Sequence, residues 1–296
     1  MNDPLPNVYD PQNAAALCAL AAAAYGADLS DLSDGWDVAG RIVDAGTDTQ
    51  VMIWKNPRDM VVAFRGTRSL RNFVTDLNCR RVPLLPGKEA EVHEGFQRAL
   101  DGVYEALQSS VEEMTGGPGA PRLWITGHSL GGALAMLCAW RISNLRSEIS
   151  NALAGVYTFG EPRVGNAAFR DGYDARLKSR TFRVVDGEDF IPRIPWLLAM
   201  YRHCGHEVFY GPAMTNDKCS MANCQSSDTA IENRSSKICH WQLDPPWWAK
   251  AFSDVFGTWN EWKRDGRLAL LADHNISQYQ ALFHLKFEIS NLKSPA

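Results

Sequence analysis

The chain has 296 residues, 45% of them hydrophobic and 22% charged, and this ordinary globular composition excludes a disordered, collagen-like or low-complexity protein. A formal net charge of −4 offers no basic surface of the kind that binds nucleic acid nonspecifically. No apolar run approaches the roughly 18–20 residues of a membrane span. We therefore expect a soluble protein that forms one domain over residues 1–296, with no transmembrane segment and no nucleic-acid partner.

The first predicted element is a helix over Asn13–Tyr25, ended by Gly26. Its alanine run is similar in composition to the apolar part of a secretory signal. A signal needs positive charge ahead of that part, and the first Lys or Arg of the chain is Arg41. We expect no signal peptide in this chain, and a cytoplasmic location, or secretion by another route or with a removed signal, stays open.

Strand-like and helical segments then alternate along the chain. The pattern predicts strands at Val51–Trp54, Met60–Phe64, Leu123–Thr126, Val156–Phe159 and Phe182–Val185, and helices at Gly95–Met114, Leu130–Asn144, Ala167–Lys178 and Ser277–Leu292. Such alternation is typical of an α/β protein, in which a mostly parallel central sheet carries helices on both faces. Active sites of such folds lie beyond the carboxyl ends of the strands.

Residues from about 200 to 240 are irregular and polar, and we interpret them as a surface excursion. They hold Cys204, Cys219, Cys224 and Cys239, four of the seven cysteines. No two of these have the C-x-x-C spacing of a zinc finger, so we expect no metal, although a zinc site, one or two disulfides and reduced thiols all remain open. The oligomeric state stays open as well.

The clearest motif is Gly127–Gly131, which reads G-H-S-L-G and lies between an apolar strand and an apolar helix. This strand–turn–helix setting is the one that a nucleophile elbow requires, with Ser129 as the nucleophile. Because a serine hydroxyl is a weak nucleophile, a base and an orienting acid must follow later in the chain, in the order Ser, Asp or Glu, His.

Two histidines lie in the C-terminal stretch where the base is expected. His284 falls inside an amphipathic helix, whereas His274 lies on a loop just before it, so we favour His274. The acid belongs at the end of a strand between serine and base. Asp186, Glu188 and Asp189 all meet that condition, and the residues alone do not choose among them.

At this point the chain resembles the fungal-type class 3 lipases, a family of the α/β-hydrolase superfamily. Beside the elbow, five segments resemble family motifs in the family's order: Val61–Thr67 (VVAFRGT), Val92–Phe96 (VHEGF), Thr158–Asn166 (TFGEPRVGN), Asp189–Pro195 (DFIPRIP), and Asp273–His274 with Tyr279. The departures are a longer spacer before Tyr279, the stretch from Cys204 to Cys239, and Arg193 where fungal members often have His.

The resemblance implies an α/β-hydrolase fold with a short helical lid, and it places the triad acid at Asp189. The residue after the nucleophile, Leu130, supplies one backbone N–H to the oxyanion hole. The resemblance implies that Thr67 supplies the second donor and that Asp76 holds the Thr67 hydroxyl. A solvated helix residue is the alternative for Asp76.

The segment after Thr67 predicts a short amphipathic helix, because its apolar residues have the spacing i, i+3, i+4, i+7. These residues are Leu70, Phe73, Val74 and Leu77. The resemblance implies that this helix belongs to a lid over about residues 68–82 that opens at a lipid surface. The alternative is a helix docked permanently on the core.

The expected function is therefore a serine carboxylic ester hydrolase, a lipase that cleaves acylglycerols at a lipid–water interface without cofactor or metal. A phospholipase A1 and a feruloyl-type esterase of the same family share every motif named here. A non-catalytic lipid-binding protein and a peptidase are the rivals from other classes.

Overall fold

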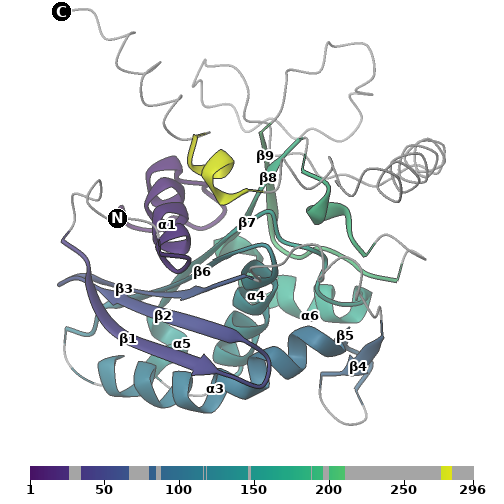
Figure 1. Cartoon of the computed structure of the whole chain (residues 1–296), viewed down its shortest axis with the longest axis horizontal. Helices are drawn as coiled ribbons and strands as arrows, with labels where there is room; N and C mark the ends of the chain where they lie inside the picture. The colour runs from purple at the N-terminus through teal and green to yellow at the C-terminus, as the bar shows by residue number, and fades with distance from the viewer. Residues whose placement is uncertain are drawn as a thin grey trace, which may run out of the picture.

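The computed structural model describes residues 1–26, 35–66, 80–84, 88–115, 117, 119–145, 148–187, 189–195, 200–210 and 275–281. These residues build a seven-stranded sheet in the order β1-β2-β3-β6-β7-β8-β9 (Figure 1). Its strands are β1 (Asp37–Asp44), β2 (Thr49–Lys55), β3 (Asp59–Phe64), β6 (Arg122–His128), β7 (Leu153–Phe159), β8 (Thr181–Asp186) and β9 (His206–Tyr210). Strands β1 to β3 pair antiparallel, and the pairs from β3 to β9 are all parallel. The predicted α/β architecture with a mostly parallel sheet is confirmed.

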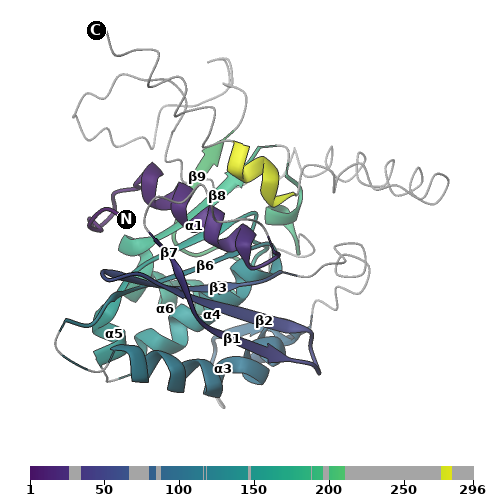
Figure 2. The same cartoon turned by 60° about the vertical axis from the view of Figure 1, so that its left-hand side comes forward.

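Helices cover both faces of this sheet, as the two views show (Figures 1 and 2). One face carries α3 (Glu94–Thr115), α4 (Leu130–Ser143), α5 (Glu148–Ala152) and α6 (Ala167–Leu177), and the other carries α1 (Pro11–Ala23) and the helical residues 276–281. Two short 3-10 helices, η1 (Lys178–Arg180) and η2 (Ile191–Arg193), flank β8. No helix within the described ranges is both long and apolar enough to cross a bilayer.

Strand β3 shows why two separate cores form. All six of its residues are buried, since the strand lies inside the sheet with a helical layer on each side. Its side chains alternate, so that Met60, Val62 and Phe64 pack toward α3 and α4, while Val61 and Ala63 pack toward α1. Helix α3 matches this surface with buried residues spaced three or four apart, from Phe96 to Val111.

Helix α1 begins and ends two residues earlier than predicted. The Asp10 carboxylate accepts hydrogen bonds from the backbone N–H groups of Gln12 and Asn13, and Pro11 occupies the first helical position. Both features favour a helix start at this point. Gly26, at φ 99°, lies just beyond the end of the helix.

The interpretation of residues 200–240 as an irregular excursion is wrong for residues 206–210. These residues form β9, which pairs in parallel with β8 and buries Val208 and Tyr210. Polar His206 and Glu207 mask the alternation in the sequence. Cys204 is also buried rather than on the surface, and its thiol is free, whereas Cys219, Cys224 and Cys239 lie outside the described residues.

A second, two-stranded sheet overlaps the end of the predicted lid range. Strand β4 (Arg81–Pro83) pairs antiparallel with β5 (Glu91–His93), so residues 81 and 82 are part of a strand rather than of a helical lid. His93 ends β5 and fixes the start of α3, because its Nδ1 accepts hydrogen bonds from the Gly95 and Phe96 amides.

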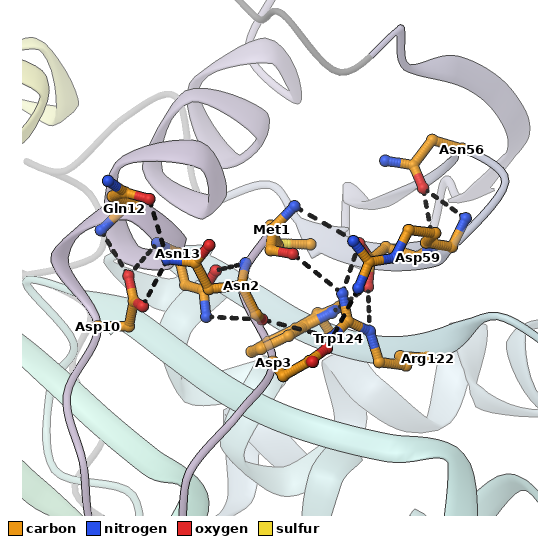
Figure 3. A network of polar contacts seen from close by, with 11 residues as sticks. Met1, Asn2, Asp3, Asp10, Gln12, Asn13, Asn56, Asp59, Arg122 and Trp124 are labelled. Atoms are coloured by element: carbon orange, nitrogen blue, oxygen red, sulfur yellow. Dashed lines mark hydrogen bonds and ion pairs between the residues drawn. The ribbon is translucent and has the colours of Figure 1, made fainter.

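A buried carboxylate ties β3 to β6 at the amino ends of these parallel strands (Figure 3). Asp59 is fully buried, and its two oxygens accept hydrogen bonds from Arg122 at 2.7 and 3.0 Å. The indole N–H of Trp124 adds a third at 2.9 Å. The network lies at the edge of the sheet opposite to the turn that holds Ser129.

Candidate active site

Ser129 occupies the turn between β6 and α4 in a strained conformation. Its φ of 58° and ψ of −130° lie outside the regions that a residue with a side chain ordinarily adopts. The residue is 1% exposed, and its Oγ makes no hydrogen bond among the described residues. The predicted strand–turn–helix setting of the motif is therefore present. The strained residue of this turn is Ser129, the one that carries the candidate nucleophilic hydroxyl.

Glycines in the motif are required by close approach of the backbone. A Cβ at Gly127 would lie 2.3 Å from the carbonyl group of Gly131. A Cβ at Gly131 would lie 2.2 Å from the carbonyl oxygen of Phe64, at the end of β3. Helix α4 thus starts in direct contact with the carboxyl ends of β3 and β6, and no larger residue fits at either position.

Two amide groups beside the nucleophile have different roles. The Ser129 N–H donates to the Phe159 carbonyl at 2.9 Å, which ties the turn to the end of β7. The Leu130 N–H lies at the first position of α4, where helix geometry provides no acceptor within the helix. Such an amide can stabilise a developing negative charge, and the oxyanion role of Leu130 stays a prediction.

Asp189 lies just after β8, at the same edge of the sheet, and is fully buried. Its Oδ1 accepts the Ile191 N–H at 2.8 Å, and its Oδ2 accepts the Tyr279 hydroxyl at 2.5 Å. Asp186, by contrast, is the half-buried last residue of β8, and Glu188 lies outside the described residues. Of the two carboxylates described, Asp189 has the buried, hydrogen-bonded environment that an orienting acid needs.

The role of Tyr279 is missed by reasoning from the sequence, although the residue belongs to a recognised motif. Its hydroxyl accepts the Asp186 N–H at 3.3 Å and donates to Asp189. Burial and the adjacent Asp189 charge raise the pKa of Tyr279 well above its ordinary value, so the phenol keeps its proton. The tyrosine therefore fixes the acid from the C-terminal segment.

Tyr25 is a second residue that the sequence does not indicate. Its hydroxyl lies 3.3 Å from Nδ1 of His128, the residue before the nucleophile. A Cβ at Gly66 would lie 2.2 Å from this hydroxyl and 3.4 Å from Cβ of Ser129. The end of α1 and the end of β3 thus meet beside Ser129.

The remaining predicted site residues lie outside the described residues. These are Thr67, the lid residues Leu70, Phe73, Val74, Asp76 and Leu77, and the candidate base His274. Gly66, directly before Thr67, is next to Ser129, and the described helix that carries Tyr279 begins two residues after His274. The structure thus brings Ser129, Leu130 and Asp189 to one edge of the sheet, and leaves the other positions as predictions.

Comparison with known proteins points to one family. The profile of "Lipase (class 3)" matches residues 61–198. A lipase of Rhizomucor miehei is 32% identical over 193 residues, covering 64% of this chain and 52% of that protein. A secreted mono- and diacylglycerol lipase of Fusarium solani is 32% identical over 154 residues, covering 51% and 44%. The chain thus spans about half the length of these two relatives.

Solved structures give the same result. The lipase of Rhizopus microsporus var. chinensis superposes with a TM-score of 0.62 at 26% identity, covering 71% of this chain and 80% of that one. A triacylglycerol lipase whose catalytic centre is described as a serine protease triad superposes with a TM-score of 0.59 at 26% identity, covering 67% and 78%. Residues 61–198 of this chain thus match the class 3 lipase family, and the superposed lipases support the α/β-hydrolase fold.

Proposed function

We propose that the protein is a serine carboxylic ester hydrolase of the lipase type, which acts through an acyl-enzyme. The observation that carries the proposal is the strained Ser129, whose hydroxyl has no partner in the described part of the chain and which lies at the same sheet edge as the buried Asp189. The match of residues 61–198 to the class 3 lipase family supports the same chemistry.

The proposed steps use side-chain and backbone groups of the chain. The Ser129 oxygen attacks the ester carbonyl while His274 takes its proton, and the Leu130 and Thr67 amides stabilise the oxyanion. His274 then returns the proton to the departing alcohol. Water hydrolyses the acyl-enzyme by the same route in reverse, and Asp189 orients and stabilises the imidazolium.

The proposed substrates are acylglycerols at a lipid–water interface. The relatives are named lipases, including secreted mono- and diacylglycerol lipases. The spacing of Leu70, Phe73, Val74 and Leu77 in the sequence predicts an apolar helix face, and this pattern supports a lid. Burying such side chains is worth about 1.5–3 kcal/mol each, so water keeps the lid shut and a lipid surface that accepts this face opens it.

An activity profile tests the substrate class. Hydrolysis is measured with short- and long-chain triglycerides, phosphatidylcholine and a feruloyl ester, with and without emulsion, together with fluorophosphonate labelling of Ser129. We expect labelling at Ser129 and preferred cleavage of emulsified triglycerides. Preference for phosphatidylcholine or the feruloyl ester overturns the acylglycerol assignment, and absence of labelling overturns the serine hydrolase itself.

The lid has its own test. The rate on a sparingly soluble triglyceride is expected to rise sharply as its concentration passes the solubility limit, because only the lipid surface offsets exposure of the apolar face. A Phe73→Ser variant should lose most of that rise and keep its rate on dissolved ester. A rate that passes the limit without a break contradicts the lid.

A further inference from the structure

A group of buried polar side chains lies next to the nucleophile turn and has no part in the proposed steps of ester hydrolysis. Its members, called the Glu161 cluster here, are Glu161, Thr158, Arg183 and His203. Glu161 follows β7 and is 2% exposed. Neither of its carboxyl oxygens makes a hydrogen bond among the described residues, and the same is true of Thr158 Oγ1, Arg183 Nη1 and His203 Nδ1. Buried polar atoms without partners are uncommon in folded proteins, so this group calls for a physical explanation.

The Glu161 cluster extends from the nucleophile turn to the loop that carries Asp189. On one side, a Cβ at Gly132 would lie 2.8 Å from Cβ of Glu161, so this residue packs against the first turn of α4, three positions after Ser129. On the other side, His203 Nε2 lies 2.6 Å from the carbonyl oxygen of Pro192. Pro192 follows Ile191, whose amide holds Asp189.

The hydrogen-bond partners assign the proton of His203. The Pro192 carbonyl only accepts, so Nε2 carries the hydrogen and Nδ1 of the neutral ring presents a lone pair. The Nδ1 atom lies 3.9 Å from Oε1 of Glu161, just beyond hydrogen-bond distance, so a small rotation of the carboxyl group can bring the two atoms into contact. The oxygen of an ionised carboxylate would repel Nδ1, because both atoms would present a lone pair. A protonated carboxyl group can instead rotate and donate its hydrogen to Nδ1. The geometry therefore favours a proton on Glu161.

The charges around the pair agree with this placement. Burial raises the pKa of Glu161 to about 7, and the nearby Arg183 charge opposes this rise in part. Burial, with the charges of Arg183 and Arg163, lowers the pKa of His203 well below its ordinary value.

The other titratable groups around the cluster do not compete for this proton. Arg183 forms an ion pair at 3.1 Å with Glu207 of β9. Burial raises the pKa values of Tyr173 on α6 and of the Cys204 thiol, so both stay neutral.

We propose that Glu161 is a positioning residue which, as a neutral acid, rotates by a small amount to donate a hydrogen bond to His203 and so couples the nucleophile turn to the Asp189 loop. Ionisation of Glu161 replaces that donation with attraction to Arg183 and releases the coupling. The effect of this coupling on kcat rests on the proposed ester hydrolase function, whereas the protonation of Glu161 does not.

The first test detects the proton on Glu161 directly and does not depend on enzymatic activity. An infrared spectrum of the full chain at about pH 6 is expected to contain a protonated-carboxyl band that is lost at about pH 8.5, since the transition is centred near 7. The band should be absent from Glu161→Gln and present in Glu113→Gln, whose side chain is exposed on α3. A wild-type spectrum without the band at about pH 6, or a band retained in Glu161→Gln, overturns the proposal.

The second test measures, through kcat, whether Glu161 couples the nucleophile turn to the Asp189 loop. The side-chain amide introduced by Glu161→Gln can donate to His203 at every pH, so this variant should keep kcat within about threefold of wild type at about pH 6. The wild-type to Glu161→Gln ratio of kcat should then fall as pH rises through 7, with KM unchanged. Glu161→Ala, measured at the same pH, should lose at least about tenfold in kcat, because it leaves His203 Nδ1 without a donor.

The two tests separate the proposals. A kcat ratio that stays constant across this pH range overturns the coupling. If the infrared band behaves as expected and wild type cleaves no ester at all, the protonation assignment stands and the proposed function fails. If Glu161→Ala does not fold, Glu161→Gln and the infrared band still decide the outcome.

Discussion

The hydroxyl of Tyr279 donates a 2.5 Å hydrogen bond to Oδ2 of Asp189, 90 positions earlier in the chain, and both side chains are fully buried. This bond joins the end of β8 to the C-terminal segment, in which Tyr279 follows the candidate base His274 by five positions in the sequence. It gives the candidate acid a neutral donor that keeps its proton. A neutral partner therefore holds the Asp189 carboxyl group in place.

Removing the Tyr279 hydroxyl should therefore affect both stability and catalysis. Because hydrogen bonds to charged groups contribute about 1.5–3 kcal/mol, Tyr279→Phe should lower the free energy of unfolding by about that amount. It should also lower kcat/KM about tenfold. Denaturant titration and ester hydrolysis measure the two effects. Tyr157→Phe is the control, since its buried hydroxyl contacts the Asp10 amide at 3.4 Å away from the site. Equal kcat/KM values for the two variants would contradict this role.

The contact between α4 and β3 predicts intolerance at Gly131. A Cβ there would lie 2.2 Å from the Phe64 carbonyl oxygen, which no side-chain movement relieves. Gly131→Ala should lower the free energy of unfolding by at least about 3 kcal/mol or prevent folding. Gly46→Ala places its Cβ at an ordinary 3.5 Å from Asp44 and should change the free energy by less than about 0.5 kcal/mol. Thermal unfolding of both variants checks this, and a stable Gly131→Ala protein would be incompatible with the described turn.

Asp59 is expected to matter for stability alone. Removing its carboxylate leaves Arg122 without its main partner and Trp124 without its acceptor, so Asp59→Ala should cost about 3 kcal/mol in free energy of unfolding. Because Asp59 lies at the amino ends of the strands, kcat of the folded variant should equal that of wild type. Asp3→Ala removes an exposed partner of the same arginine and should cost less than about 1 kcal/mol. A selective loss of kcat in Asp59→Ala would show that the network reaches the site.

The raised pKa of Glu161 predicts how stability depends on pH. The folded state binds this proton up to about pH 7, whereas an unfolded glutamate releases it near its ordinary value of 4.5. Stability is therefore greatest below that lower value and falls as pH rises toward 7, by up to about 1.4 kcal/mol per pH unit. Glu161→Gln should abolish this slope, which unfolding titrations between about pH 5 and pH 8 measure. Parallel curves for wild type and Glu161→Gln would contradict the shift.

The elements that the sequence predicts well are those with strong local signals. The apolar run of β3 and the periodic apolar residues of α3 fix both elements to within two residues. The half-exposed β1 and the polar start of β9 have no such signal, because each strand is stabilised by pairing with a neighbour rather than by its own composition.

The residues of the site also divide into those with a local signal in the sequence and those without one. Ser129 and Leu130 are predictable because the motif encodes the turn that holds them. The residues alone leave three acids open, and the resemblance to the family selects Asp189. The burial and hydrogen bonds of Asp189 now support that choice. Tyr25, Tyr279 and Glu161 could not be given roles in advance, since each acts through a contact between segments distant in the chain.

The central claim is that the hydroxyl of Ser129 carries the reaction. It is tested most directly by kcat/KM of Ser129→Ala on a short-chain ester, with Ser109→Ala on the exposed side of α3 as the control. We predict a loss of at least about 10⁴-fold in Ser129→Ala, at an unchanged unfolding temperature, and wild-type activity in the control. A Ser129→Ala protein that retains a tenth or more of the wild-type kcat/KM would contradict the account.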